Sequence, residues 1–319
     1  MIILYFLLLL GLGVYSYSQI DLNLTLLRTP WFLGFQHIMI QLGYFNRPLS
    51  TALFLIITLL LFAFYILFLK NNTKNLLIIL IAGIIVLGIF SYPAFSHDIF
   101  NYIFDARILV VHHANPYTST ALMFPEDTWT RFMNWTHRTY PYGPLFLPIS
   151  VAVYLLGAHK FILTLTLFKT LMVAAYAGSV YYIYKISGKK GAFLFALNPL
   201  IIYEAVVSSH LDILMLFFAL AAVYKKSYLF WLFSVGIKYV TIFLPPRFSF
   251  RWLVVLAYVG AIAQVLSREL LPHYFIIPLG FSALLPNNKY LIWLGIVLSF
   301  ILVVIRYSPF LLYGQWPRL

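Results

Sequence analysis

The chain has 319 residues, of which 63% are hydrophobic, 19% aromatic and only 9% charged. Water-soluble domains carry about 25% charged residues, so this composition excludes a soluble protein and predicts an integral membrane protein. The net charge of +13 would suggest nucleic acid binding in a soluble protein. Here the 21 Lys and Arg residues mostly separate apolar runs, so we expect topology signals, membrane lipid contacts and no nucleic acid.

Apolar runs that could span a membrane follow one another along the chain. A spanning helix needs about 20 mostly apolar residues, and the best candidates are 2–20, 50–69, 75–94, 161–184, 228–246, 251–267 and 290–306. Two shorter runs, 191–208 and 211–224, predict a tight hairpin. Three prolines in 271–286 predict a broken or interfacial helix. We therefore expect an all-α polytopic membrane protein, one transmembrane domain over 1–319 with about nine to ten transmembrane helices.

Basic clusters predict the sides of the membrane through the positive-inside rule. The clusters around Lys70, Lys185 and Lys225 are expected in the cytoplasm, which places the polar segment 95–142 outside. Segment 143–158 must then be a juxtamembrane helix, because a further crossing would move Lys185 to the outside. Long polar loops are usually functional. We therefore expect an extracytoplasmic catalytic loop over 95–160, in the plasma membrane or an equivalent membrane.

The polar loop carries two carboxylates on one face of a predicted helix. Asp98, Asn101, Tyr102 and Asp105 have the spacing i, i+3, i+4 and i+7. Carboxylates on an outer loop can simply be solvated. Alternatively, Asp98 is a general base whose pKa is raised by partial burial beside a span. Asp105 is the second candidate for the base or a sugar ligand.

Histidines in the same loop raise the question of a metal. His97, His112, His113 and His137 lack the spacing of a common metal motif, and the absence of cysteine excludes Cys-ligated sites. We expect no metal site and no cofactor. A divalent metal held by Asp98 or Asp105 with a histidine stays an open alternative.

Further polar residues interrupt the apolar runs later in the chain. Glu204, His210 and Asp212 surround the outer end of the predicted hairpin, and Lys238 lies within a predicted span. Ionisable groups inside a membrane are costly, so they indicate a functional site. Lys238 either snorkels to the interface or binds an anion, of which a lipid phosphate is the natural one.

The order of these motifs resembles the GT-C superfamily of integral membrane glycosyltransferases. Asp98, Tyr102, Arg107 and Asn115-Pro116-Tyr117 precede a PYGPLFL stretch that begins at Pro141. The closest likeness is to polyprenol-phosphate-mannose-dependent α-mannosyltransferases, whose later features are similar to Asn198-Pro199-Leu200, His210-x-Asp212 and Lys238. The resemblance covers roughly 90–270. Glu204 and Ser209 depart from the pattern.

The resemblance implies transfer of a hexose, with mannose expected, from a polyprenyl or dolichyl phosphate to an extracytoplasmic acceptor. The acceptor would be a glycan, a glycolipid or a protein, and the displacement would invert the anomeric centre. Asp98 is the expected catalytic base. The expected substrate-binding residues are Asp105, Tyr102, Arg107, Asn115, Tyr117, Arg138, Tyr142, Glu204, His210, Asp212 and Lys238. Arg107 would reach the phosphate only if its helix bends or the lipid wraps around it.

Two other classes of protein stay open at this point. A polytopic lipid or sugar transporter, or a flippase, commonly has inverted repeats and charges near the midplane, whereas here the acids gather at one membrane face. A non-catalytic subunit with a GT-C-like fold would bind the lipid phosphate without turnover.

Overall fold

The computed structural model describes residues 1–70 and 74–316, and within them every regular element is a helix. Five helices in the described residues are long and apolar enough to cross a membrane. The first, Ile2–Gln19, consists of helix α1 (Ile2–Ser16) and the 3-10 turn that follows it. The others are Arg47–Lys70 (α3), Phe161–Ala196 (α7), Phe250–Ser267 (α11) and Lys289–Tyr313 (α13). Their composition confirms an all-helical membrane protein.

The remaining α-helices are shorter, and several of them replace a predicted span. They are Pro30–Ile40 (α2), Lys74–Phe90 (α4), Asp98–Val110 (α5), Phe146–Leu156 (α6), Pro199–Ile201 (α8), Asp212–Lys225 (α9), Tyr228–Ile237 (α10) and Ile276–Ser282 (α12). Predicted span 228–246 breaks at Lys238, and 271–286 is a short turn followed by α12, in keeping with its prolines. The described residues therefore contain fewer helices that are long enough to cross a membrane than the nine or ten predicted.

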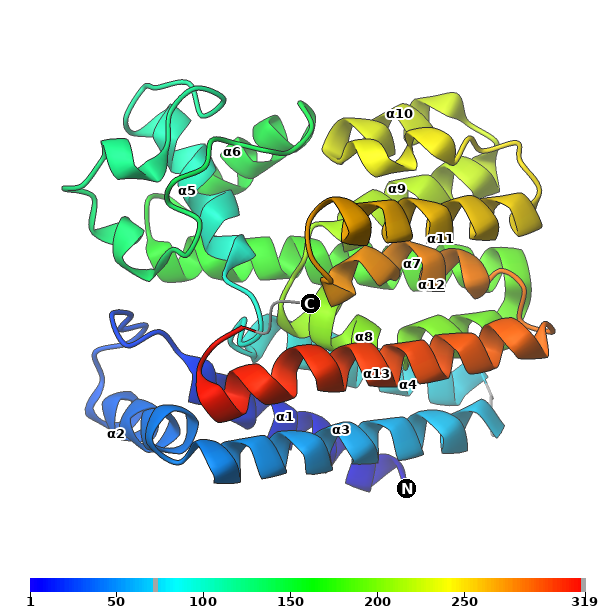
Figure 1. Cartoon of the computed structure of the whole chain (residues 1–319), viewed down its shortest axis with the longest axis horizontal. Helices are drawn as coiled ribbons and strands as arrows, with labels where there is room; N and C mark the ends of the chain where they lie inside the picture. The colour runs from blue at the N-terminus through cyan, green and yellow to red at the C-terminus, as the bar shows by residue number, and fades with distance from the viewer. Residues whose placement is uncertain (71–73, 317–319) are drawn as a thin grey trace.

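The predicted hairpin is present as a sharply bent pair of helices. The segment Pro199–Val207, whose last part is a π-helical turn over Ile202–Val207, meets Asp212–Lys225 at 109°. π-Helical turns often mark functional sites. The bend places the residues of its turn at the middle of the molecule rather than at a membrane surface loop, as Figure 1 shows for α8 and α9.

Helix α6 has the length of a juxtamembrane helix. Its 11 residues are too few to span a bilayer, and it packs against α5 and the start of α7. Figure 1 shows α5, α6 and the loop between them gathered at one end of the helix layers. The end of α3, the start of α4 and the bend in α7 lie at the opposite end. The two groups are thus separated by the length of α7.

One glycine allows the bend in α7. Gly188 has φ +78° and ψ −168°, a conformation that a side chain would strain. The chain turns there and returns toward the middle of the molecule, where Asn198 begins the hairpin by accepting a hydrogen bond from the Leu200 amide at 2.9 Å. This return carries the hairpin into the core.

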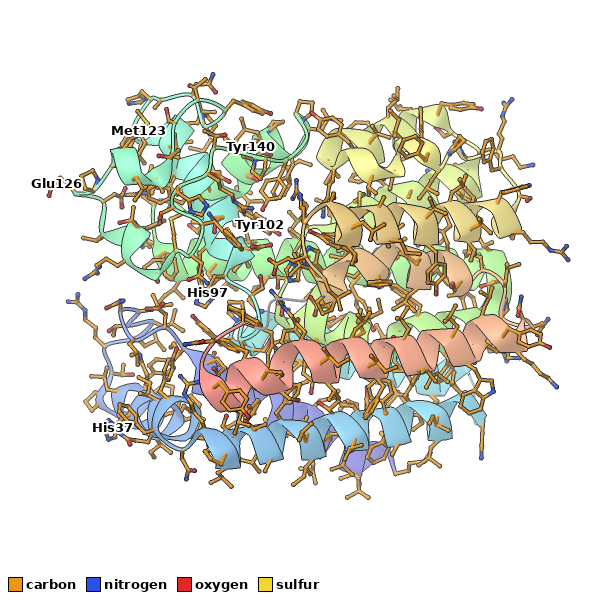
Figure 2. The ribbon with its side chains drawn as sticks, viewed as in Figure 1. His37, His97, Tyr102, Met123, Glu126 and Tyr140 are labelled. Carbon is orange, nitrogen blue, oxygen red and sulfur yellow. The ribbon has the colours of Figure 1, made fainter. Side chains whose placement is uncertain are left out.

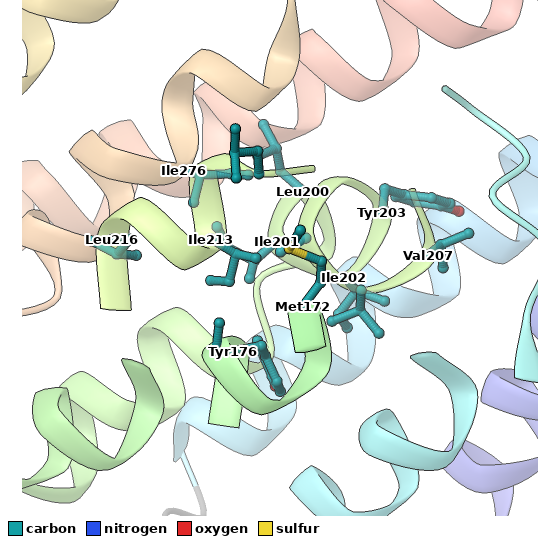
Figure 3. Packing of buried hydrophobic residues seen from close by; sticks show 14 of the residues in the cluster. Met172, Tyr176, Leu200, Ile201, Ile202, Tyr203, Val207, Ile213, Leu216 and Ile276 are labelled. Carbon is teal, nitrogen blue, oxygen red and sulfur yellow. The ribbon is translucent and has the colours of Figure 1, made fainter. Parts of the chain in front are cut away.

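The hairpin is buried on all sides, and apolar residues surround it. Figure 3 shows Met172 and Tyr176 of α7 packed against the Leu200–Val207 segment, with Ile213 and Ile276 closing the opposite side. In this setting the amine of Lys169, on α7, donates to the Val207 carbonyl at 2.9 Å. A cation at the carbonyl end of a helical segment is stabilising. Lys169 therefore holds the turn that presents the polar residues of the hairpin.

Candidate active site

A cavity of about 1320 Å³ lies where α5, the hairpin turn and the C-terminal segments meet. Figure 2 shows Tyr102 on the side of α5 toward the middle of the molecule, and Glu126 at the tip of the outer loop. Of the predicted site residues, the structure places eight at the cavity wall: Asp98, Tyr102, Arg138, Tyr142, Glu204, His210, Asp212 and Lys238. It places Asp105, Arg107, Asn115 and Tyr117 elsewhere.

Asp98 begins α5, and both of its carboxylate oxygens have a neighbour. The Trp135 indole donates to Oδ1 at 3.1 Å, and His210 Nδ1 lies 3.5 Å from Oδ2. Trp135 is positioned by Asn101, one turn along α5, whose side-chain amide donates to the Trp135 carbonyl at 3.2 Å. Tyr102, on the same helix, accepts a hydrogen bond from the Leu211 amide at 3.2 Å. α5 and the hairpin are thus joined directly at the site.

The expectation of a raised pKa for Asp98 is wrong. Burial by itself raises the pKa of this carboxyl, but the contact with His210 and the positive charges of Arg138 and Lys238 outweigh it. The net effect holds the pKa of Asp98 below its ordinary value. Sequence reasoning considered the burial but did not include these cations, which come from distant parts of the chain.

A buried row of polar groups continues from Asp98 through His210. Nε2 of His210 lies 3.1 Å from Glu204 Oε2, and the Tyr307 hydroxyl donates to the other oxygen of Glu204. The ring of His273 stacks on the ring of His210, with centroids 4.1 Å apart. Glu204 is fully buried. The row therefore joins the outer helix α5 to the last long helix, α13.

Lys238 has its anionic partner within the protein. Its amine lies 2.9 and 3.1 Å from the two carboxylate oxygens of Asp212. Lys238 ends α10 in an extended conformation, which carries its side chain away from the lipid and toward the hairpin. The amine of Lys238 thus has a carboxylate partner within the protein, and its role as a phosphate ligand stays a prediction.

Among residues 1–70 and 74–316, the cavity wall contains as many fixed positive charges as negative ones. The carboxylates are Asp98, Glu204, Asp212 and Glu269, and the cations are Arg138, Lys238, Arg268 and Arg306. Among the described residues, Lys238 and Arg306 are ion-paired, whereas no carboxylate oxygen lies within 4.0 Å of Arg138 or Arg268. Arg138 donates to the Tyr142 hydroxyl at 3.0 Å and lies over the Trp135 ring. Arg268 is hydrogen-bonded to Tyr274, so both guanidinium groups have hydroxyl partners but neither is ion-paired with a carboxylate of the described residues.

Arg107 stabilises the outer loop and does not reach the cavity. Its guanidinium pairs with Asp127, donates to the Tyr154 hydroxyl at 2.8 Å and lies 4.3 Å from the centre of the Trp129 ring. His112 Nε2 lies 2.8 Å from the same Asp127 carboxylate. Helix α5 is continuous from Asp98 to Val110, so it turns Arg107 away from Asp98. The straight helix excludes the bend as a route for Arg107 to the phosphate, and contact with a lipid that wraps around the residue stays a prediction.

The Asn115-Pro116-Tyr117 motif forms a turn on the protein surface. The Asn115 side-chain oxygen accepts from the Tyr117 amide at 3.0 Å, a contact typical of Asx turns. The Tyr117 ring packs edge-on against Tyr140, 5.0 Å between centroids. The motif therefore orders the approach to Tyr142 rather than contacting the cavity.

Asp105 is buried behind the cavity wall. Burial raises its pKa to about 7, the charge of Arg138 opposes this shift, and the charge of Asp98 adds to it. Tyr140 and Tyr142 also lie close enough for Asp105 to influence their pKa values. At neutral pH this carboxyl is therefore partly protonated, in contrast to Asp98.

We expect Asp105→Asn to remove a pH dependence of stability. The Asp105 carboxyl has a higher pKa in the folded state than in the unfolded state, so its protonated form stabilises the fold. This contribution to stability is complete below about pH 4 and is lost as the pH rises through about 7. A shift of about three units corresponds to about 4 kcal/mol at most. The melting temperature of Asp105→Asn relative to wild type should therefore rise between pH 5 and pH 8. Glu126→Gln, at the exposed loop tip, is the control, and an equal response in both variants would contradict the assignment.

Several residues of the cavity wall were not predicted. Trp135, Arg268, His273, Arg306 and Tyr307 all line it. Glu269 also lines the cavity, and the guanidinium of Arg306 lies 3.2 Å from its carboxylate. The available signal was charge in an apolar C-terminal region. His273 and Tyr307 carried no such signal, because their types are common in ordinary membrane helices and interfaces.

Residues 11–264 match the family described as MptA_B, alpha-(1->6)-mannopyranosyltransferase, N-terminal domain. No curated protein and no solved structure gives a significant match. The match runs from α1 into α11 and includes Asp98, Arg138, the hairpin and Lys238. The chain therefore belongs to the MptA_B family of alpha-(1→6)-mannopyranosyltransferases, in agreement with the resemblance of its motifs to GT-C membrane mannosyltransferases.

Proposed function

We propose that the protein transfers mannose from a polyprenyl or dolichyl phosphate to a hydroxyl group of an extracytoplasmic acceptor. The proposal rests on one observation: a fixed carboxylate and guanidinium groups that are not paired with a carboxylate of the described residues line the same large cavity. Asp98 provides the carboxylate, and Arg138 and Arg268 provide the cations. This is the pair of charges that the transfer of a sugar from a phosphate requires.

Asp98 would act as the general base. Its carboxylate accepts the proton of the acceptor hydroxyl as that oxygen bonds to the anomeric carbon of mannose. The bond from the anomeric carbon to the phosphate oxygen breaks on the opposite face, and its electron pair leaves with the phosphate. The anomeric centre is inverted. A phosphate needs no proton to leave, so one carboxylate is enough, whereas a glycosidase uses two.

Arg138 and Arg268 would stabilise the charge that develops on the leaving phosphate. Preorganised cations at the position where charge appears lower the barrier more than cations that must rearrange. Arg138 is held in place by the Tyr142 hydroxyl and by the Trp135 ring, which also contacts Asp98. Trp135 therefore contacts both the base and the cation, and it fixes their positions relative to each other.

A lipid-linked donor is supported by the apolar side of the cavity. There the wall is formed by the 239–243 segment and by α11, and Ile242 and Phe243 are 47% and 66% exposed. Exposed apolar side chains on a membrane protein face lipid. A polyprenyl chain could therefore lie along this side while its phosphate enters the cavity. Polar and ionic groups line the other side, where a glycan, glycolipid or protein acceptor would approach.

The extracytoplasmic location is supported by the distribution of basic residues. The ends of α3 and of the first part of α7 carry Lys70 and Lys185, and they lie at the end of the molecule opposite α5 and α6. The positive-inside rule assigns the basic end to the cytoplasm. We assign no resident cofactor to the transfer step itself.

In detergent, the purified protein should transfer labelled mannose from a synthetic polyprenyl-phosphate mannose to a mannoside acceptor. From the activity of the family, we expect the product to contain an α-(1→6) linkage. A transporter or flippase would move the donor across vesicles without forming product. A non-catalytic subunit would bind the donor without turnover. Either of these results, with folded protein, would overturn the proposal.

A further inference from the structure

Three buried side chains beside Asp98 have the composition of a divalent metal site. One carboxylate oxygen of Glu204 and one ring nitrogen each of His210 and His273 all lie within 4.8 Å of one another. Glu204 comes from the π-helical turn, His210 from the bend of the hairpin, and His273 from the turn Pro272–Phe275. Their exposed fractions are 0%, 3% and 7%. Three separate segments thus converge on one buried point at the cavity wall.

Among the described residues, Oε2 of Glu204 has an ionic contact with His210 but no bond of hydrogen-bond geometry. Nε2 of His210 lies 3.1 Å from Oε2 of Glu204, yet within the described residues Oε2 has no hydrogen bond, and it is closed to solvent. An unsatisfied buried acceptor costs about 1–3 kcal/mol, and more when it is charged. A shared cation would satisfy both atoms.

The surroundings of the three residues are those of oriented metal ligands. Tyr307 donates a hydrogen bond to the other oxygen of Glu204, which leaves Oε2 directed at the histidines. The second ring nitrogen of His210, Nδ1, lies 3.5 Å from the Asp98 carboxylate. Histidine ligands commonly present their second nitrogen to a carboxylate, which orients the ring and increases its basicity. The ring of His273 stacks on that of His210 with an angle of 26° between the planes, so a shared ion requires one of the two rings to rotate.

We propose that Glu204, His210 and His273 form a binding site for a divalent cation of the zinc class. Two histidines and one glutamate are a known ligand set of catalytic zinc sites, in which the fourth position is left to water or substrate. In this protein all three ligands line the cavity, so that position opens toward the substrate space. The site differs from the sequence-based alternative, in which Asp98 or Asp105 held the metal. The proposal concerns cation binding and does not depend on the sugar or its donor.

The test is a titration of the full-length protein in detergent after treatment with a chelator. Co²⁺ is the first probe, because its visible absorption reports a tetrahedral nitrogen and oxygen environment, and Zn²⁺ then competes for the same site. We expect one equivalent of Co²⁺ per chain, displaced by Zn²⁺. Glu204→Gln and His273→Gln should each weaken binding on the order of 10- to 100-fold or more. His137→Gln is the matched control, because His137 lines the same cavity outside the cluster.

Several outcomes would overturn the proposal. Wild-type protein that takes up no stoichiometric cation excludes the site without any variant. Equal affinity in wild type, Glu204→Gln and His273→Gln would place the cation elsewhere. Tyr307→Phe keeps all three ligands and should weaken binding about tenfold, so it provides a second test if a ligand variant does not fold. Unchanged affinity in Tyr307→Phe would remove Glu204 from the ligand set. None of these measurements uses the transferase substrates, so a failure here is distinguishable from a failure of the proposed function.

Discussion

Asp98→Asn is expected to lower the rate of mannose transfer by about 10²–10⁴-fold, the usual contribution of a positioned general base. The substitution keeps the size of the side chain, and the amide oxygen can still accept the hydrogen bond from Trp135 that Asp98 accepts at 3.1 Å. What it removes is the ability to take a proton from the acceptor hydroxyl. The measurement is the initial rate with synthetic polyprenyl-phosphate mannose and a mannoside acceptor, with donor binding measured in parallel.

The control for this experiment is a carboxylate that lies outside the cavity. Glu126 is exposed at the tip of the outer loop (Figure 2), so Glu126→Gln should transfer mannose at the wild-type rate. Donor affinity in Asp98→Asn should also stay near wild type, because the carboxylate acts on the acceptor side. A turnover close to wild type in Asp98→Asn would exclude the residue as the base. Loss of donor binding together with turnover would instead indicate a role in positioning the donor.

The second large effect is expected from the ion pair between Lys238 and Asp212. The Asp212 side chain is only 4% exposed, and both of its oxygens lie within 3.1 Å of the Lys238 amine. Lys238→Met leaves this carboxylate buried without a partner, which costs about 3–5 kcal/mol. The melting temperature in detergent should fall accordingly. The double variant Asp212→Asn with Lys238→Met should recover much of the loss, because it removes both charges.

A comparison with an exposed lysine distinguishes this pairing from a general effect of removing a lysine. Lys226→Met removes an exposed charge at the end of α9 and should leave the melting temperature nearly unchanged. If Lys238→Met is as stable as wild type, the ion pair contributes nothing to the fold. Such a result would favour the role expected for Lys238 from the sequence, that of a phosphate ligand whose charge is used by the substrate.

The sequence was informative wherever composition and local spacing carry the signal. Low charge and long apolar runs predicted helices that span a membrane. The basic clusters predicted that 143–158 would not cross, and α6 is indeed only 11 residues long. Prolines in 271–286 predicted its break. The scarcity of acidic residues also drew attention to Glu204 and Asp212, which lie at the cavity wall.

Local patterns were less informative where a partner comes from a distant segment. A lysine in the middle of an apolar run appeared to lie within a continuous span, but its pairing with Asp212 ends helix α10 at that point. Arg107 fits a family motif, yet its helix directs it to Asp127. The pKa of Asp98 was expected to rise because burial was visible in the pattern, whereas the opposing cations were not.

The sequence by itself determined that this protein is helical, lies in a membrane and has a catalytic motif order like that of membrane mannosyltransferases. These properties depend on composition, on periods of a few residues and on short ordered motifs. Only the tertiary structure decided which cations at the cavity are paired with a carboxylate, and which histidine joins Glu204 and His210 beside Asp98. The reason is physical: the net charge available to a phosphate or a cation depends on pairings between segments that are up to about a hundred residues apart, such as Glu204 with Tyr307.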